Sequence, residues 1–224
     1  IIELNQTDIE LPKSEKAANK LSATGKLTAP ADKDISGTLK ISSDAVDFSG
    51  ITSLLPEANK PAEPVEDFVS ELSSLPEAFA GMALDLQLQL AKVFWKNITL
   101  AKADISGKAN GKVIDLPKVS FELNGIPVTS KFRIDKSKPK PVYAFEVQLM
   151  DQLAQPLVAV FDPESKEAIA GKVTVLAKLT SSGATQGEFW TNLNGDAEFK
   201  FAEGDLRLFS DTTKILLTPV AVLL

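Results

Sequence analysis

The sequence contains no cysteine and no histidine, and each absence excludes a class of chemistry. Without cysteine there is no thiol nucleophile, no disulfide bond and no thiolate ligand for zinc. Without histidine there is no imidazole general base and no imidazole metal ligand. We therefore expect no metal centre and no cofactor. A chain without thiols is indifferent to redox poise, so cysteine usage does not indicate the compartment.

An excess of positive charge is also missing. The 24 Lys and Arg residues are outnumbered by 30 Asp and Glu residues, which gives a formal net charge of −6 at pH 7. No long-range field attracts a polyanion, so the composition argues against binding to nucleic acid.

Long hydrophobic runs are absent as well. No stretch of about 18 apolar residues occurs, so the sequence offers no candidate for a membrane-spanning helix. The chain opens on Ile1 and Ile2 without a methionine and ends in the apolar residues 217–224, so we expect it to be part of a longer protein. With 44% hydrophobic and 24% charged residues, the composition is that of a globular domain.

Apolar and polar residues alternate along much of the chain, most regularly over 84–90, where leucines alternate with Asp85, Gln87 and Gln89. Successive side chains of a strand point to opposite faces, so this pattern predicts a strand with one apolar face. We expect about ten to thirteen strands. The same alternation marks 21–23, 39–41, 119–123, 132–134, 143–149, 173–179, 197–201 and 206–208.

Turn-forming residues separate these segments, as in Asn124-Gly125 and Asn194-Gly195. Short connections join antiparallel neighbours. The predicted fold class is therefore mostly β: a long curved antiparallel sheet, forming an open groove or half of a sandwich, with three short amphipathic helices.

The three helices are predicted from apolar residues at helical spacing. The first follows Pro64 and ends at Pro76, the second starts behind a cap at Asp151, and the third covers about 185–193. The apolar positions are Val65, Phe68, Val69 and Leu72 in the first, Leu153, Leu157, Val160 and Phe161 in the second, and Phe189, Trp190 and Leu193 in the third.

We expect one β-rich domain over residues 1–224. It contains two possible sub-units, 1–55 and 82–224, joined by a proline-rich and helical insertion at 56–81. The tetrapeptide Asp-Ile-Ser-Gly at 34–37 recurs at 104–107, which is a weak sign of internal duplication.

The apolar strand face is the main functional candidate. The alternation has two interpretations, because a packed β-sandwich core and a lipid-lined groove both require it. The candidate groove residues are Leu86, Leu88, Leu90, Val119, Phe121, Phe132, Ile134, Phe145 and Val147.

A cluster of cations surrounds a proline-containing hairpin tip. It is either a solvated turn or a contact for anionic lipid head groups or an acidic partner. The two tryptophans are interpreted as core residues, with stacking on a sugar ring or a lipid interface as the alternatives. The cluster consists of Lys131, Arg133, Lys136, Lys138 and Lys140.

Catalytic signals are weak. Acid and base catalysis by a carboxylate pair needs two facing groups in a cleft, which the spacing of Glu188 and Glu198 does not establish. The match of 137–140 to S-x-x-K needs a helix, which Pro139 and Pro141 oppose. We therefore expect a protein that is not an enzyme.

The segment 171–208 resembles the C-terminal region of the AsmA family. That region has a strand, a glycine-containing turn, a short helix ending in Leu-x-Gly, and a strand running into an acidic-glycine turn. Here these parts are 173–179, 181–183, 188–195, 197–201 and 203–206. The similarity extends over most of the chain from about Leu84 onward and more loosely over the front. The proline-rich stretch 56–64 departs from the family pattern.

The resemblance implies an envelope protein of Gram-negative bacteria, located in the periplasm and anchored in the inner membrane by a segment before Ile1. It also implies a long curved sheet whose apolar concave face carries lipid. We therefore expect a non-enzymatic module that binds or guides phospholipid acyl chains and contributes to lipid transport or outer-membrane assembly. One alternative is an envelope scaffold with a filled core that binds protein or glycan, and a carbohydrate-active enzyme is the third.

Overall fold

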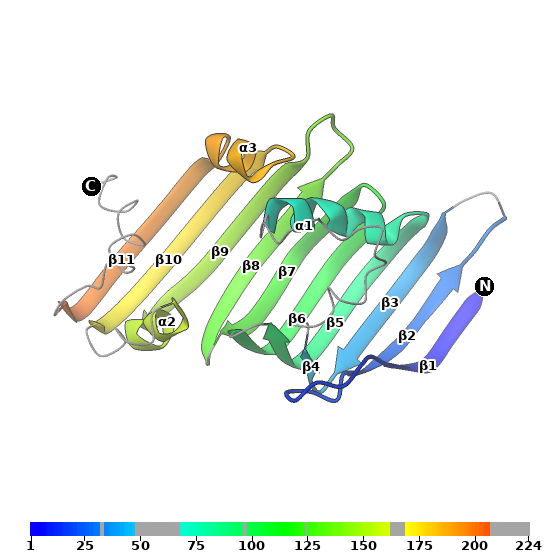
Figure 1. Ribbon diagram of the computed structural model, residues 1–224, viewed down its shortest axis with the longest axis horizontal. Helices are drawn as coiled ribbons and strands as arrows, with labels where there is room; N and C mark the ends of the chain where they lie inside the picture. The colour runs from blue at the N-terminus through cyan, green and yellow to red at the C-terminus, as the bar shows by residue number, and fades with distance from the viewer. Residues whose placement is uncertain (32–33, 48–67, 96–97, 124, 162–168, 207–224) are drawn as a thin grey trace.

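The computed structural model describes residues 1–31, 34–47, 68–95, 98–123, 125–161 and 169–206. They form one open sheet of 11 strands (Figure 1). The mostly β fold class expected from the sequence is therefore confirmed. The strands are β1 (Ile2–Glu10), β2 (Lys20–Thr28), β3 (Ile35–Ser43), β4 (Val46–Asp47), β5 (Met82–Trp95), β6 (Ile98–Asn110), β7 (Val113–Leu123), β8 (Ile126–Asp135), β9 (Val142–Leu153), β10 (Ile169–Ser182) and β11 (Asn194–Leu206).

The strands lie in the sheet almost in the order of the chain. The path is β1-β2-β3-β5-β6-β7-β8-β9-β10-β11, and β4 pairs with β5 beyond the end of β3. Neighbours are antiparallel except at β5, which runs parallel to both β3 and β4. A parallel pair needs a crossover connection, and the chain between β4 and β5 includes the first helix. The sheet is thus mostly antiparallel as expected, and β5 departs from this pattern after a long connection.

The period-two pattern gives the sheet one apolar and one polar face. In β5, Leu84, Leu86 and Leu90 are buried and Leu88 is half-buried, whereas the alternate residues Asp85, Gln87 and Gln89 are exposed. Cross-strand pairing places apolar residues opposite apolar residues, as in Phe132 with Phe145. A shift of one residue in this register would move every leucine to the wrong face, so burial fixes the register.

Charges of opposite sign alternate from strand to strand on the polar face. The Nζ atom of Lys108 lies 3.0 Å from Asp85, and a guanidinium nitrogen of Arg133 lies 2.8 Å from Asp115. These side chains are largely exposed, so each pair contributes about 0 to 1 kcal/mol. These exposed charged side chains make the polar face of the sheet a water-exposed surface. In one row the paired positions run Glu3, Lys26, Thr38, Asp85, Lys108, Asp115 and Arg133.

Two glycines permit unusual backbone within strands. Gly37 in β3 has φ of 149° and Gly195 in β11 has φ of 138°, values that side chains rarely allow. A Cβ at either position would overlap a carbonyl oxygen of the neighbouring strand, that of Lys26 or Lys178. Glycine in a strand interior marks such a close approach of backbones.

Three short helices lie against the apolar face, near the ends of the strands (Figure 1). They are α1 (Phe68–Ser74), α2 (Ala154–Phe161) and α3 (Gln186–Thr191). The 3₁₀ helix η3 (Leu75–Phe79) continues α1. Pro76 thus ends the α-helical geometry as expected, because it cannot donate a hydrogen bond in a helix interior. The start expected at 64–67 lies outside the described residues.

The predicted cap of the second helix was wrong. Asp151 belongs to β9 and has φ of 51°, and its backbone N–H donates a hydrogen bond to Thr174 Oγ1 at 3.0 Å. An N-cap residue instead has extended geometry and a side chain that accepts from the first turn. Thr185 meets both conditions for α3, with φ of −121° and an oxygen that accepts from the N–H of Glu188.

Most of the buried apolar residues form four clusters near the strand ends. Val69 and Leu72 of α1 and Phe189 of α3 pack on Ile134 and Tyr143, and Phe79 of η3 packs beside Leu84 and Leu86. At the opposite ends of the strands, Leu157 of α2 packs beside Val128, and Val46 of β4 packs on Leu90. We call the first border the α3 rim (α1, η3, α3 and the turns at 110–112 and 136–141) and the second the α2 rim (α2, β4 and 11–19).

Strand pairing is continuous from β1 to β11. The two sub-units suggested by the sequence meet at the β3–β5 pairing, in which Leu39 lies opposite Leu86. None of the helices in the described part of the chain has the length and apolar character required to cross a membrane.

Candidate functional site

A single row of cross-strand partners follows the middle of the apolar face across the sheet. Each member is the register partner of the next, from β1 at one edge to β11 at the other. Strands lie about 4.8 Å apart, so the row is about 40 Å long. We call it the median strip. Its members are Thr7, Ala23, Ile41, Leu88, Ile105, Val119, Ser130, Val147, Ala177 and Ala197.

The median strip is apolar and lies between the two rims. From Ile41 to Ala177 every member is half-buried, in contrast to the buried residues near the strand ends. The only polar side chain in that stretch is Ser130. Ile105 and Val119 pack against none of the four buried clusters. The described residues thus leave an apolar band that is neither sealed like a core nor freely exposed.

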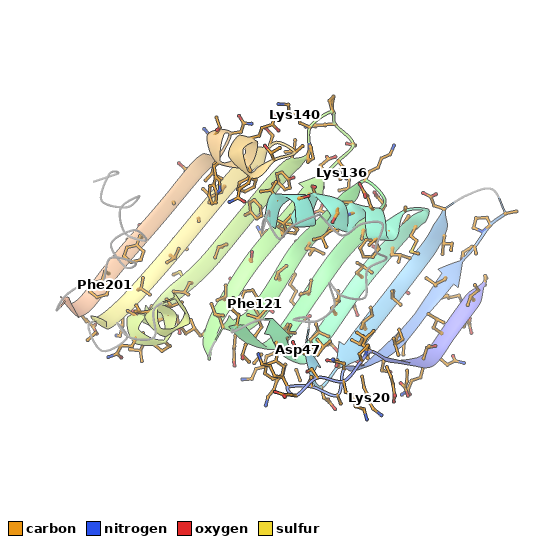
Figure 2. All side chains as sticks on the ribbon, in the orientation of Figure 1. Lys20, Asp47, Phe121, Lys136, Lys140 and Phe201 are labelled. Carbon is orange, nitrogen blue, oxygen red and sulfur yellow. The ribbon has the colours of Figure 1, made fainter. Side chains whose placement is uncertain are left out.

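The nine residues predicted to line a groove all lie on the apolar face. Three of them are buried, namely Leu86, Leu90 and Ile134. The others are half-buried, and Figure 2 shows Phe121 among the side chains in front of the sheet. Leu88, Val119 and Val147 belong to the median strip, whereas Phe121, Phe132 and Phe145 flank it.

Aromatic rings connect the α3 rim to the apolar face. The ring of Phe189 lies 5.3 Å from that of Tyr143 and 6.0 Å from that of Phe145, both edge-on. Phe145 in turn lies 5.2 Å from Phe132. Trp190 lies 5.4 Å from Phe189, also edge-on, and is 56% exposed. The interpretation of Trp190 as a core residue was therefore wrong, while the side chain of Trp95 lies outside the described residues.

The five cations do not form one cluster. Lys131 and Arg133 lie in β8 on the polar face, because they alternate with Phe132 and Ile134. Lys131 is 2.7 Å from Glu146, and this hydrogen bond holds the pKa of Glu146 below its usual value. The other three lie in or beside the β8–β9 turn.

The β8–β9 turn ties together the helices of the α3 rim. Lys136 pairs with Glu77 of η3, and Lys140 donates to Glu188 of α3 at 2.7 Å. Figure 2 shows Lys136 and Lys140 at this border of the sheet. The Lys140 hydrogen bond, followed by one from the N–H of Ala184, lowers the pKa of the Glu188 carboxyl. Lys138 has no ion-pair partner among the described residues.

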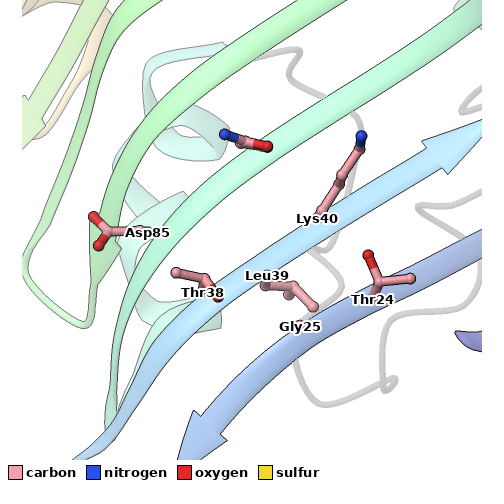
Figure 3. Close-up of a pocket in the computed structure, with 7 residues that line it drawn as sticks. Thr24, Gly25, Thr38, Leu39, Lys40 and Asp85 are labelled. Carbon is pink, nitrogen blue, oxygen red and sulfur yellow. The ribbon is translucent and has the colours of Figure 1, made fainter. Parts of the chain in front are cut away.

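Two hollows lie on the polar face. One of about 320 Å³ lies over β2, β3 and β5 and has Lys40, Asp85 and Gln87 in its lining. Figure 3 shows Lys40 and Asp85 there. Asp85 is paired with Lys108 of the neighbouring strand at 3.0 Å. The other hollow lies over β7, β8 and β9, beside Lys118 and Glu146. Each lining contains a single carboxylate, Asp85 in one and Glu146 in the other, whereas glycoside hydrolysis uses two.

No group of three or more acidic side chains in the described ranges could hold a metal ion. Within the same ranges every buried side-chain nitrogen or oxygen has a hydrogen-bond partner. The most distinctive chemical feature of the described surface is therefore the apolar band.

Sequence reasoning missed several members of the median strip, including Ile41, Ile105 and Ala177. Ile41 and Ala177 belong to alternating segments that were recognised as strands, so their apolar character was visible. Their place in one row depends on register between strands, which a single sequence does not encode in its spacing.

A comparison of the chain with protein-family models, with curated proteins and with solved structures finds no match in any of the three.

Proposed function

We propose that this chain is a lipid-binding module of the cell envelope that holds acyl chains along the median strip and is similar in this respect to AsmA proteins. One observation carries the proposal: a half-buried apolar row crosses the sheet between rims that are separately packed. The family and the location rest on the sequence resemblance of 171–208.

The dimensions support an acyl chain as the occupant. The hydrocarbon core of a bilayer is about 30 Å thick, so the acyl chain of one leaflet extends about 15 Å. A strip of about 40 Å exceeds this length. Each methylene that leaves water for an apolar surface contributes about 0.8 kcal/mol, so a chain lying along Leu88, Ile105 and Val119 would bind without any specific polar contact.

The residues near the strand ends are more deeply buried than those of the median strip, which supports a role for the strip other than stabilising the fold. Ile134 and Tyr143 are fully buried under α1 and α3, and Val46 of β4 is fully buried against Leu90 of β5. These packed ends stabilise the fold, which leaves the half-buried middle available for a ligand.

Charge substitutions at three matched positions test the proposal. Val119→Glu places a carboxylate in the strip at a site that packs on no buried cluster, so it should abolish lipid binding while the domain still unfolds cooperatively. Thr129→Glu adds the same charge on the exposed polar face and should change neither property. Ile134→Glu buries the charge in a packed cluster and should unfold the domain.

The readouts are native mass spectrometry for lipid that co-purifies with the protein and thermal melting for the fold. The expected result is lipid on the parent and on Thr129→Glu, and none on a folded Val119→Glu. Absence of lipid from the parent, or unchanged lipid on Val119→Glu, would reject the proposal. Unfolding of Val119→Glu would favour the alternative of a scaffold with a filled core.

A further inference from the structure

The α3 rim carries an exposed tryptophan together with lysines that have no ion-pair partner among the described residues. Trp190 is 56% exposed although it belongs to a helix whose next-door residue, Phe189, is buried. Leu75, where α1 passes into η3, is 44% exposed on the same rim. Tryptophan combines an apolar ring with a polar N–H, which suits the boundary between water and a bilayer.

The local structure holds Trp190 in place. Thr185 caps the start of α3, and Asn192 Nδ2 donates to the carbonyl of Ser182 at 2.8 Å beyond its end. Ser181 Oγ donates to the carbonyl of Phe189 at 2.5 Å from within the sheet. A side chain on a helix fixed at both ends loses little freedom when it docks.

The charge of this rim is positive although the chain is acidic overall. Its lysines outnumber its carboxylates, and two of them, Lys112 and Lys138, have no ion-pair partner among the described residues. Asp135 at the start of the turn pairs with Arg133, which also pairs with Asp115. The charged residues of the rim are four lysines, Lys112, Lys136, Lys138 and Lys140, and three glutamates, Glu71, Glu77 and Glu188.

The α2 rim differs. It exposes Met150 and Leu153, at 57% and 55%, but Asp151 lies between them. The nearby cation Lys172 is paired with Glu203 at 3.0 Å. Exposed apolar residues are thus present at both borders, and Lys13 of the α2 rim also lacks an ion-pair partner among the described residues. The α3 rim is distinguished by an exposed tryptophan together with two such lysines, Lys112 and Lys138.

We propose that the α3 rim docks on an anionic bilayer surface, with Trp190 at the level of the head groups and Lys112 and Lys138 contacting them. Trp190 leads through Phe189 to Phe145 and Phe132 beside the median strip, so docking would bring a membrane to the entrance of the apolar face. This last link to lipid uptake rests on the proposed function, whereas docking itself is measured independently.

Fluorescence of Trp190 tests docking directly. The chain contains two tryptophans, so Trp95→Phe leaves Trp190 as the only one. Vesicles of mixed phosphatidylglycerol and phosphatidylcholine should shift its emission to shorter wavelength at low salt, and brominated acyl chains should quench it. Vesicles of phosphatidylcholine alone should produce neither effect.

Paired variants test the electrostatic contribution. In the Trp95→Phe background, Lys112→Ser with Lys138→Ser should weaken binding to the anionic vesicles at least about ten-fold, since each lysine near an anionic surface contributes about five-fold. The matched control is Lys40→Ser with Lys92→Ser, two cations away from the rim that also lack an ion-pair partner among the described residues, and it should bind like the parent. Circular dichroism confirms that all variants are folded.

Three results would overturn the inference: no emission shift with anionic vesicles, equal binding to neutral vesicles, or equal loss in the control pair. Val119→Glu separates the two proposals, because it should still dock while losing co-purified lipid. Docking by a parent that carries no lipid would reject the proposed function and leave this inference standing.

Discussion

The hydroxyl of Tyr143 donates a hydrogen bond of 3.1 Å to the carbonyl oxygen of Gly183. Tyr143 is the only tyrosine of the chain and is fully buried in β9, and the Gly183 N–H donates to the carbonyl of Pro141 at 3.0 Å. The two bonds connect the start of β9 with the loop that leads into α3. One buried side chain therefore positions the helix that carries Trp190.

Replacing Tyr143 by phenylalanine should lower the free energy of unfolding by about 1 to 2 kcal/mol. The ring still fills its site among Ile134 and Phe189, but the buried carbonyl of Gly183 loses its donor. Urea unfolding followed by circular dichroism measures the change. The comparison variant is Tyr143→Leu, which removes the packing of the ring as well as the hydrogen bond and should therefore destabilise the domain clearly more. Equal stability of the parent and Tyr143→Phe would show that the bond contributes nothing net.

Glycine substitutions should separate backbone strain from helix propensity. Gly195→Ala should destabilise by about 1 to 3 kcal/mol, because φ of 138° disfavours alanine and the new methyl would meet the carbonyl of Lys178. Gly187→Ala lies in α3 with nothing within 4 Å of the added carbon, so it should stabilise by about 0.5 to 1 kcal/mol. Thermal melting of both variants gives the sign of the change in stability relative to the parent. A change of the same sign in both variants would contradict the prediction.

The faces of the strands could be predicted from the sequence because alternation depends only on neighbours in the chain. That is why all nine proposed groove residues lie on one face, and why Lys131 and Arg133 could have been assigned to the opposite face from Phe132. The median strip could not be predicted, since it requires the register of every strand pair.

The parallel pairing of β3 with β5 and the exposure of Trp190 depend on tertiary structure. Either a crossover or a hairpin can connect two strands. The sequence between β4 and β5 does not show whether β5 pairs with the preceding strands in parallel or antiparallel orientation. In α3, Phe189 and Trp190 are adjacent, so they point about 100° apart on the helix and only one can face the sheet. The sequence alone does not determine whether Phe189 or Trp190 faces the sheet.

The N-cap of α3 gives a local test of the α3 rim. The Thr185 hydroxyl accepts from the N–H of Glu188 at 3.3 Å, so Thr185→Ala should lower the free energy of unfolding by about 1 kcal/mol. Thr185→Ser keeps the oxygen and should restore most of it. In the Trp95→Phe background, Thr185→Ala should also lower the fluorescence anisotropy of Trp190, because the helix that carries it loosens. An unchanged anisotropy would mean that the other contacts of α3, among them the packing of Phe189 and the hydrogen bond from Asn192 to Ser182, hold the helix without the cap.

Acid should weaken the link between the β8–β9 turn and α3. The hydrogen bond from Lys140 lowers the pKa of Glu188 in the folded protein. Because the pKa is lower in the folded protein, the ionised carboxylate contributes to stability at pH values above the ordinary pKa of about 4.5. This contribution is lost as the pH falls below about 4.5. The contribution of this carboxylate to stability should therefore decrease on acidification.

A double-mutant cycle isolates this effect from the other carboxylates, which titrate in every variant. The free energies of unfolding of the parent, Lys140→Gln, Glu188→Gln and the double variant are measured at pH 6 and pH 3 in low salt. The coupling between Lys140 and Glu188 should favour the folded state at pH 6 and disappear at pH 3, when the carboxyl is protonated. Salt should reduce the coupling at pH 6, since both side chains are partly exposed. A coupling that is equal at both pH values would assign the contact to a neutral hydrogen bond and contradict the ion-pair interpretation.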